Sequence, residues 1–119
     1  MKKIKFRGKL NSNGKWIYGM PSHDLQYIFN EDNLDSPDNF AINSKTICEF
    51  AGLTDKNDNE YYEADIITCL SKKFKIQWVG AGFCVMTMDG IYCTILCEDN
   101  CKSYEIIGNL FENPELQTK

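Results

Sequence analysis

Thiols are the side chains of this 119-residue chain whose type and spacing best suit chemistry. Three of them lie four residues apart, and a fourth nearby would complete the thiolate set of a tetrahedral zinc site; the chain's cysteines are Cys48, Cys69, Cys84, Cys93, Cys97 and Cys101. No C-x-x-C pair is present, and a four-residue step along a strand spans about 13 Å. We therefore expect reduced thiols without a metal; a surface redox role for Cys97 or Cys101 stays open.

The acidic run Asp55–Glu60 has the oxygen-rich composition of a calcium loop. Against the EF-hand pattern, its first, third and fifth positions fit. Glu60, however, stands where glycine is needed, and Ile66 stands where a bidentate glutamate must be. The run is better interpreted as a solvated turn. Just after it, Glu63-Ala64-Asp65 precedes an apolar segment, where an acidic turn can cap backbone amides and set the register of a strand.

Other catalytic patterns are weaker. Ser22-His23-Asp24 has the residue types of a triad, but adjacent side chains point in different directions, and His23 is the single histidine of the chain. Gly80-Ala81-Gly82 lacks the further glycine or the Lys-Ser/Thr element of a nucleotide-binding loop. We expect no catalytic residues, no cofactor and no metal, and hence a protein that is not an enzyme.

Short alternating segments must position whatever the chain binds. Apolar and polar residues alternate, and turn residues separate them, which predicts strands at 4–7, 16–19, 25–29, 47–50, 65–70, 74–79, 83–88, 91–96 and 104–107. The first two form an N-terminal β-hairpin, and Asp89-Gly90 predicts another. Loops are expected at 30–39 and 52–59, and one short helical turn at 96–102. No signal peptide or membrane span is readable, so a cytoplasmic location is expected.

The net charge of −4 conceals an asymmetry. Residues 1–15 carry six cations and no acid, whereas residues 24–65 carry eleven acids and two lysines. We interpret the basic segment as a solvated edge strand whose lysines deter sheet pairing. The acidic residues 31–65 are a candidate binding face for a basic protein partner.

Nucleic-acid binding is the alternative. Aromatic side chains beside lysines can stack bases on a small barrel. The candidates are the aromatics Trp16, Tyr18, Tyr27, Phe29, Trp78 and Tyr92, with Lys72, Lys73, Lys75 and the N-terminal lysines. Alternation assigns most of these aromatics to buried faces, so we expect most of them in the core.

Three ordered segments resemble one known family. They are Ile4–Gly8 with Gly14–Gly19, Phe50–Asn57 continuing through Tyr62–Ile66, and Glu105–Leu116. Together they are similar to the YopX protein family of phages and prophages. The resemblance implies a mostly β protein with an SH3-like barrel, and an accessory phage product of uncharacterised function. This chain departs from the family at Asp58 or Asn59 and at Ala64, where the family usually has glycine.

The expected architecture is therefore mostly β, with an N-terminal β-hairpin region at 1–45 and an SH3-like barrel with a C-terminal tail at 46–119. The barrel would occupy 46–108, with Ile106 and Ile107 completing it. Gly108 and Asn109 would end the last strand, and the tail would be anchored by apolar side chains, namely Leu110, Phe111 and Leu116. The expected function is non-enzymatic binding of a host or phage protein. No membrane partner is expected, and the oligomeric state stays open.

Overall fold

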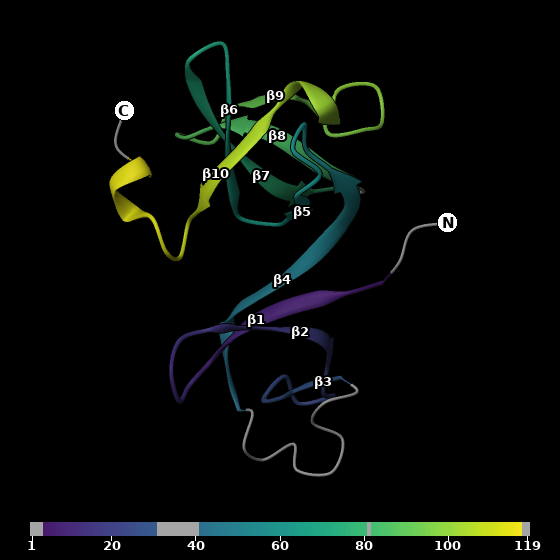
Figure 1. Ribbon diagram of the computed structural model, residues 1–119, viewed down its shortest axis with the longest axis vertical. Helices are drawn as coiled ribbons and strands as arrows, with labels where there is room; N and C mark the ends of the chain where they lie inside the picture. The colour runs from purple at the N-terminus through teal and green to yellow at the C-terminus, as the bar shows by residue number, and fades with distance from the viewer. Residues whose placement is uncertain (1–3, 31–40, 81, 118–119) are drawn as a thin grey trace. The chain divides into compact units, whose positions relative to one another are not determined.

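The described part of the chain consists mainly of β-strands (Figure 1). The structure, a computed structural model, describes residues 4–30, 41–80 and 82–117. Within these residues the strands are β1 (Phe6–Leu10), β2 (Trp16–Pro21), β3 (Ile28–Phe29), β4 (Ile42–Thr54), β5 (Glu60–Tyr62), β6 (Asp65–Cys69), β7 (Lys72–Val79), β8 (Gly82–Thr87), β9 (Tyr92–Ile95) and β10 (Glu105–Asn109). The helical segments of the same residues are 3₁₀ turns at Cys101–Ser103 and Pro114–Gln117. The predicted mostly β class is confirmed.

The described strands pair into two antiparallel sheets, in the orders β3-β2-β1-β4-β5 and β10-β6-β7-β8-β9. The chain divides into two compact units, and the division falls inside β4, between Phe50 and Ala51. Residues up to Phe50 are called the first unit below, and residues from Ala51 the second unit.

The first unit contains the predicted N-terminal hairpin, in which β1 pairs with β2. Its core is Ile17, Ile28 and Ile42. Gly8 lies over this core: a Cβ atom there would approach the Cδ1 atoms of Ile28 and Ile42 to 3.1 and 3.2 Å. The absence of a side chain at Gly8 therefore lets β1 lie directly on the isoleucines.

β1 lies between β2 and β4, so the interpretation of the basic N-terminal segment as a solvated edge strand is wrong. Its cations contact aromatic rings instead. The guanidinium of Arg7 lies 4.2 Å and the ammonium of Lys9 lies 4.6 Å from the ring centre of Trp16. The ammonium of Lys5 lies 5.1 Å from the ring centre of Phe50. Attraction between a cation and a ring face gives these residues a structural role within the sheet.

Several strand predictions have the wrong bounds. β1 covers Phe6–Leu10 rather than 4–7, and β6 ends at Cys69, so Leu70 lies in a turn rather than in the predicted 65–70 strand. The strand expected at 25–29 is confined to β3, because Leu25 takes a φ of 61° in a turn and donates its N–H to the carbonyl of Ser22 at 3.0 Å. β4 begins before the predicted 47–50 strand and continues to Thr54, so Gly52, expected in a loop, lies within a strand. The loop prediction at 30–39 falls largely outside the described residues.

The second unit is built on a meander of β6, β7, β8 and β9 (Figure 1). The hairpin predicted at Asp89-Gly90 is confirmed: the N–H of Thr87 donates to the carbonyl of Ile91 at 2.8 Å, and Gly90 has a φ of 94°. The core beneath the sheet comprises Tyr61, Ile67, Ile76, Phe83, Val85, Leu96 and Cys101. Ala81, in the predicted Gly80–Gly82 turn, lies outside the described residues.

The structure does not confirm an SH3-like barrel. β9 and β10 stand at the two ends of the second sheet, and no pairing joins them in the parts of the chain that the structure describes. The observed strand pairing is therefore that of an open sheet, and a closed barrel formed by residues 46–108 stays a prediction.

The end of β10 and the contacts that hold the tail differ from the prediction. The strand does not stop at Ile107: β10 continues through Gly108 and ends at Asn109, with a register shift between Ile106 and Gly108. Asn109 is buried, and its side-chain oxygen accepts the N–H groups of Phe111 and Glu112 at 3.0 and 2.9 Å. Polar capping by an asparagine thus begins the tail.

The side chain of Asn113 lies over Gly108, where a Cβ would come within 2.7 Å of its Cγ atom, and its oxygen accepts the N–H of Asn109 at 3.1 Å. Of the three predicted apolar anchors, Leu116 also lies near Gly108, whereas Phe111 is 40% exposed. Asparagine hydrogen bonds, which the sequence did not predict, therefore hold the tail together with the apolar contact of Leu116.

Candidate functional site

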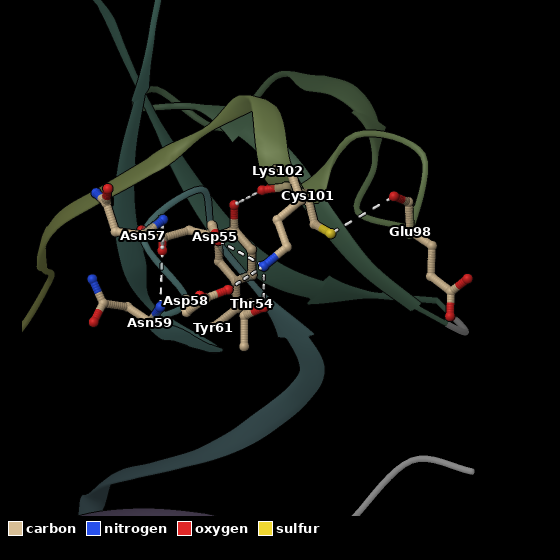
Figure 2. Close-up of polar contacts among 9 residues, drawn as sticks. All are labelled: Thr54, Asp55, Asn57, Asp58, Asn59, Tyr61, Glu98, Cys101 and Lys102. Atoms are coloured by element: carbon tan, nitrogen blue, oxygen red, sulfur yellow. Dashed lines mark hydrogen bonds and ion pairs between the residues drawn. The ribbon is translucent and has the colours of Figure 1, made fainter.

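The acidic run that suggested calcium is a tight turn centred on the buried carboxylate of Asp55 (Figure 2). One oxygen accepts the N–H groups of Asn57 and Asn59, both at 2.9 Å, and the other accepts the N–H of Ile106 in β10 at 2.8 Å. Burial alone would raise the pKa of Asp55, but these backbone donors outweigh it and hold the pKa below the usual value. The carboxylate thus ties the turn to β10.

A lysine supplies the positive charge of this turn (Figure 2). The ammonium of Lys102 donates to the hydroxyl of Thr54 at 2.6 Å, to the carbonyl of Asp55 at 3.1 Å and to the carboxylate of Asp58 at 2.7 Å. Asp58 has a φ of 65°, which aspartate tolerates, so the departure from glycine there leaves the turn intact. The oxygens of this turn therefore accept hydrogen bonds from a side-chain ammonium.

The second acidic motif also caps backbone. A carboxylate oxygen of Asp65 accepts the N–H of Tyr62 at 2.8 Å, which confirms the predicted structural role. Ala64 has a φ of 74°, so this chain places a methyl group where positive φ favours glycine.

The acids of the proposed acidic face are largely engaged in the fold. Asp55 and Asp65 are buried caps, and Asp58 pairs with Lys102. The remaining acids at 41–65 also interact with other groups; they are Glu49, Glu60 and Glu63. Residues 31–40 of that face lie outside the described residues. The described part therefore offers no free carboxylate cluster to a partner.

The cysteines near Tyr104 are not the three that the four-residue spacing grouped. Burial raises the pKa of the Tyr104 phenol, and the neighbouring thiols of Cys69, Cys97 and Cys93 add to this. Cys101, by contrast, is buried and donates its S–H to the carbonyl of Glu98 at 3.8 Å (Figure 2). Within residues 4–30, 41–80 and 82–117, no group of three His, Cys, Asp or Glu side chains is arranged to hold a metal ion.

Ser22-His23-Asp24 forms a turn. The hydroxyl of Ser22 donates to the carboxylate of Asp24 at 2.7 Å, and its oxygen accepts the N–H groups of Gln26 and Tyr27. The Ser22 hydrogen bond is the main reason why the pKa of Asp24 lies below its usual value. The serine and aspartate are joined directly rather than through the histidine, which does not match a catalytic triad.

The prediction that most candidate aromatics are core residues is wrong. Tyr18, Trp78 and Tyr92 are exposed, and Trp16, Tyr27 and Phe29 are half-buried. The buried rings are Phe50, Tyr61, Tyr62 and Phe83. Alternation placed the candidate rings on one side of a strand, but it did not determine whether that side is covered.

Exposed apolar side chains lie on β7 and β9, and we call Val79, Tyr92 and Ile95 the apolar surface, because the strand register places all three on the same face of the second sheet. Each is between 45% and 57% exposed, whereas Trp78 points to the opposite face, where its ring packs edge-on against Phe83. Val79 pairs with Gly82, and a Cβ on Gly82 would lie 3.2 Å from Cδ1 of Ile95, so this glycine lets β7 and β9 bring their apolar side chains together across β8.

A pocket of about 390 Å³ opens at one end of the same sheet. It lies between the β6–β7 and β8–β9 turns and is lined by Ser71, Lys72, Lys73, Phe74, Thr87, Met88 and Asp89. The two lysines were among the sequence candidates. The pocket itself was not, because it forms only when two hairpin ends meet in the meander.

Comparison with known proteins identifies the family. The family model described as YopX protein matches residues 5–117, nearly the whole chain. The chain belongs to the YopX protein family. This confirms the resemblance read from the three ordered segments and makes the chain a phage-type protein. No curated protein matches this YopX-family chain. Across its described residues, no helix has the length and apolar character needed to cross a membrane.

Proposed function

We propose that this YopX-family protein is a phage or prophage accessory protein that binds another protein, a host or phage factor, without catalysing a reaction. The apolar surface is the observation that carries the proposal. Tyr92 is of a residue type that is strongly enriched at the centres of protein interfaces. Contiguous apolar groups on one side of a small β-sheet are typical of an interaction surface. We further propose that the protein acts in the bacterial cytoplasm, where its thiols stay reduced.

The edge of the sheet is not the favoured route of contact. β9 is short, and its register against β8 shifts between Val85 and Met86. The side-chain amide of Asn100 donates to the carbonyl of Ile95 at 2.8 Å. A bulge and an occupied carbonyl both hinder the addition of another strand. Contact through side chains of the apolar surface is therefore preferred over strand addition.

The test is capture from a lysate of a bacterial host, followed by calorimetry with the purified partner. Tyr92→Ser removes a ring that is 57% exposed, and we expect at least about tenfold weaker binding if that ring is an interface anchor. Tyr18→Ser is the matched control, because it removes a ring that is 43% exposed from the first unit. Equal affinity of both variants and the unchanged protein would contradict the role of the apolar surface.

Nucleic-acid binding is the second candidate, and one feature of the first unit favours it. The ammonium of Lys9 lies 4.6 Å from the ring centre of Trp16, and exposed Tyr18 lies two residues further along the same strand. Cations beside rings are the combination that single-stranded nucleic acid requires. A gel-shift titration at two salt concentrations tests it, because phosphate contacts make affinity fall steeply with salt. Here Tyr18→Ser is the variant expected to weaken binding, and Tyr92→Ser is the control.

We also propose that residues 46–108, which include most of the second unit, form the SH3-like barrel that the family resemblance implies. The consecutive antiparallel strands β6 to β9 and the closely paired β10 support this assignment. An experimental structure that showed β9 and β10 far apart, with other segments between them, would contradict it.

A further inference from the structure

The turn between β6 and β7 has residues that folding alone does not favour. Cys69 pairs with Lys72, so Leu70 and Ser71 are the whole connection. Both have positive φ, 52° and 67°. Two-residue hairpins of this kind strongly prefer Asn-Gly, because positive φ crowds the Cβ atom of other residues. Leucine is a poor residue for this conformation, and its side chain is 91% exposed, so burial does not offset the strain.

A residue that breaks a local rule without a compensating contact marks a candidate functional position. Exposed leucines are common and carry little meaning singly. Here the exposure coincides with a strained backbone and with an adjacent pocket whose lining begins at the next residue, Ser71. Leu70 is thus placed to be covered by whatever enters the pocket.

The pocket combines apolar walls with positive charge. Phe74 and Met88 supply the apolar part, and Lys72 and Lys73 lie beside them. At about 390 Å³ it falls within the range of small-ligand sites and accommodates one or two large side chains. The pocket therefore suits an apolar group with an anionic neighbour.

The charges around the pocket are unequal. Lys72 is exposed and forms no ion pair with any residue that the structure describes. The one lining carboxylate, that of Asp89, accepts a hydrogen bond from the hydroxyl of Thr87. The lining thus has two cations and one anion, on a chain whose net charge is −4. Charge complementarity favours an acidic ligand at this end of the sheet.

We propose that Leu70 and this pocket form a docking site for an acidic peptide segment of a partner protein, with one apolar side chain of that segment entering between Phe74 and Met88. The inference rests on the proposed protein-binding function and gives it a location and a chemistry. We call Leu70–Phe74 with Thr87–Asp89 the hairpin-end site. The partner's carboxylates would face Lys72, and its apolar groups would cover Leu70.

The test is an NMR titration of the full-length protein with three synthetic peptides of equal length. The first alternates glutamate with leucine and phenylalanine, the second has lysine for glutamate, and the third has serine for the apolar residues. We expect the first peptide alone to shift the amide signals of the hairpin-end site, and the shifts to weaken as salt is raised. No localised shift at millimolar peptide, or equal shifts with all three, overturns the proposal.

Two variants separate docking from folding. Leu70→Asn combined with Ser71→Gly installs the preferred turn, so the melting temperature should rise by a few degrees, about 5 °C, while affinity for the first peptide falls at least about fivefold. Lys72→Glu should lower the affinity for the first peptide about tenfold. Lys56→Glu makes the same charge change on an exposed residue outside the pocket and should leave this affinity unchanged. A stabilised turn variant with unchanged affinity overturns the role of Leu70.

Other occupants give distinct results. If a thymidine decamer shifts the same signals more strongly than the acidic peptide does, the ligand of this site is single-stranded nucleic acid and the proposal is wrong. If the protein self-associates and Leu70→Asn abolishes this, the ligand of the site is a second copy of the chain and the proposal is wrong. If a purified partner binds the Lys72→Glu and turn variants as tightly as the unchanged protein, the hairpin-end site is wrong while protein binding stands. If no protein partner binds at all, the proposed function fails.

Discussion

Replacing Asp55 by asparagine tests whether one carboxylate holds the turn and β10 together. The side chain keeps its size but loses its charge and one acceptor oxygen. If the remaining oxygen still accepts the N–H groups of Asn57 and Asn59, the new NH₂ group faces the N–H of Ile106. Both groups are hydrogen-bond donors, so the bond to Ile106 is lost. A lost hydrogen bond to a charged group contributes about 1.5–3 kcal/mol, so we expect Asp55→Asn to lower the free energy of unfolding by about 2–3 kcal/mol.

The assay is chemical and thermal denaturation at neutral pH. For a domain of this size, a loss of 2–3 kcal/mol corresponds to a melting temperature lower by about 10 °C. Asp58→Asn is the control, because it removes a carboxylate from the same turn at an exposed position with positive φ that asparagine tolerates. We expect its effect to stay within about 0.5 kcal/mol. An Asp55→Asn protein as stable as the control would refute the reasoning.

The pH dependence gives an independent check. The pKa of Asp55 is lower in the folded protein than its usual value, so the unfolded chain takes up the proton first as pH falls. The carboxylate therefore stabilises the fold fully above the usual aspartate pKa, about 3.9, and this contribution is lost as pH falls through the folded pKa. The stability difference between the unchanged protein and Asp55→Asn should be constant above about pH 5 and shrink below pH 4. A difference that persists undiminished at pH 2 would contradict the assignment.

Three further substitutions probe other parts of the fold by denaturation. Ala64→Gly should stabilise the protein by about 0.5 kcal/mol, because relief of positive φ outweighs the extra entropy of the unfolded chain, whereas Ala51→Gly should destabilise it. Gly108→Ala should cost about 1–3 kcal/mol and speed hydrogen exchange in the tail, since the new methyl group would displace Asn113; unchanged exchange would argue against this contact. Tyr61→Phe should cost about 1 kcal/mol by removing the hydroxyl that donates to the carbonyl of Cys101 at 2.6 Å. Burial raises the pKa of the Tyr61 phenol, so this difference should persist at neutral pH and disappear only in strong alkali.

Local sequence rules predicted the elements that depend on neighbouring residues. Alternation located the strands of the meander, and Asp89-Gly90 located its tight turn. Asp65 was correctly interpreted as a cap, because an acidic residue before an apolar strand meets the backbone amides of its own turn. In each case the groups that interact lie within a few positions of each other.

The features that the sequence did not predict depend on distant contacts. β4 is long because its first part pairs with β1, about forty residues away. Lys102 reaches Asp58 across 44 positions, and Asp55 reaches Ile106 across 51. The Leu70-Ser71 turn escaped notice because it lacks the residues that mark such turns. Burial of an aromatic face likewise depends on what packs over it, and a single strand does not contain that information.

The hairpin-end site that we propose favours a partner of the opposite charge to the one that the sequence suggested. The sequence places most acids in one half of the chain, which suggested a basic partner. Yet the described carboxylates of that half are engaged: Asp55 and Asp65 accept backbone N–H groups, and Asp58 pairs with a lysine. Charges committed to internal contacts attract a partner less than their number suggests, because their hydrogen bonds and ion pairs offset their field. Lys72, by contrast, is exposed beside an apolar pocket. The lining of the described pocket therefore has a net positive charge, and the hairpin-end site that we propose favours an acidic partner.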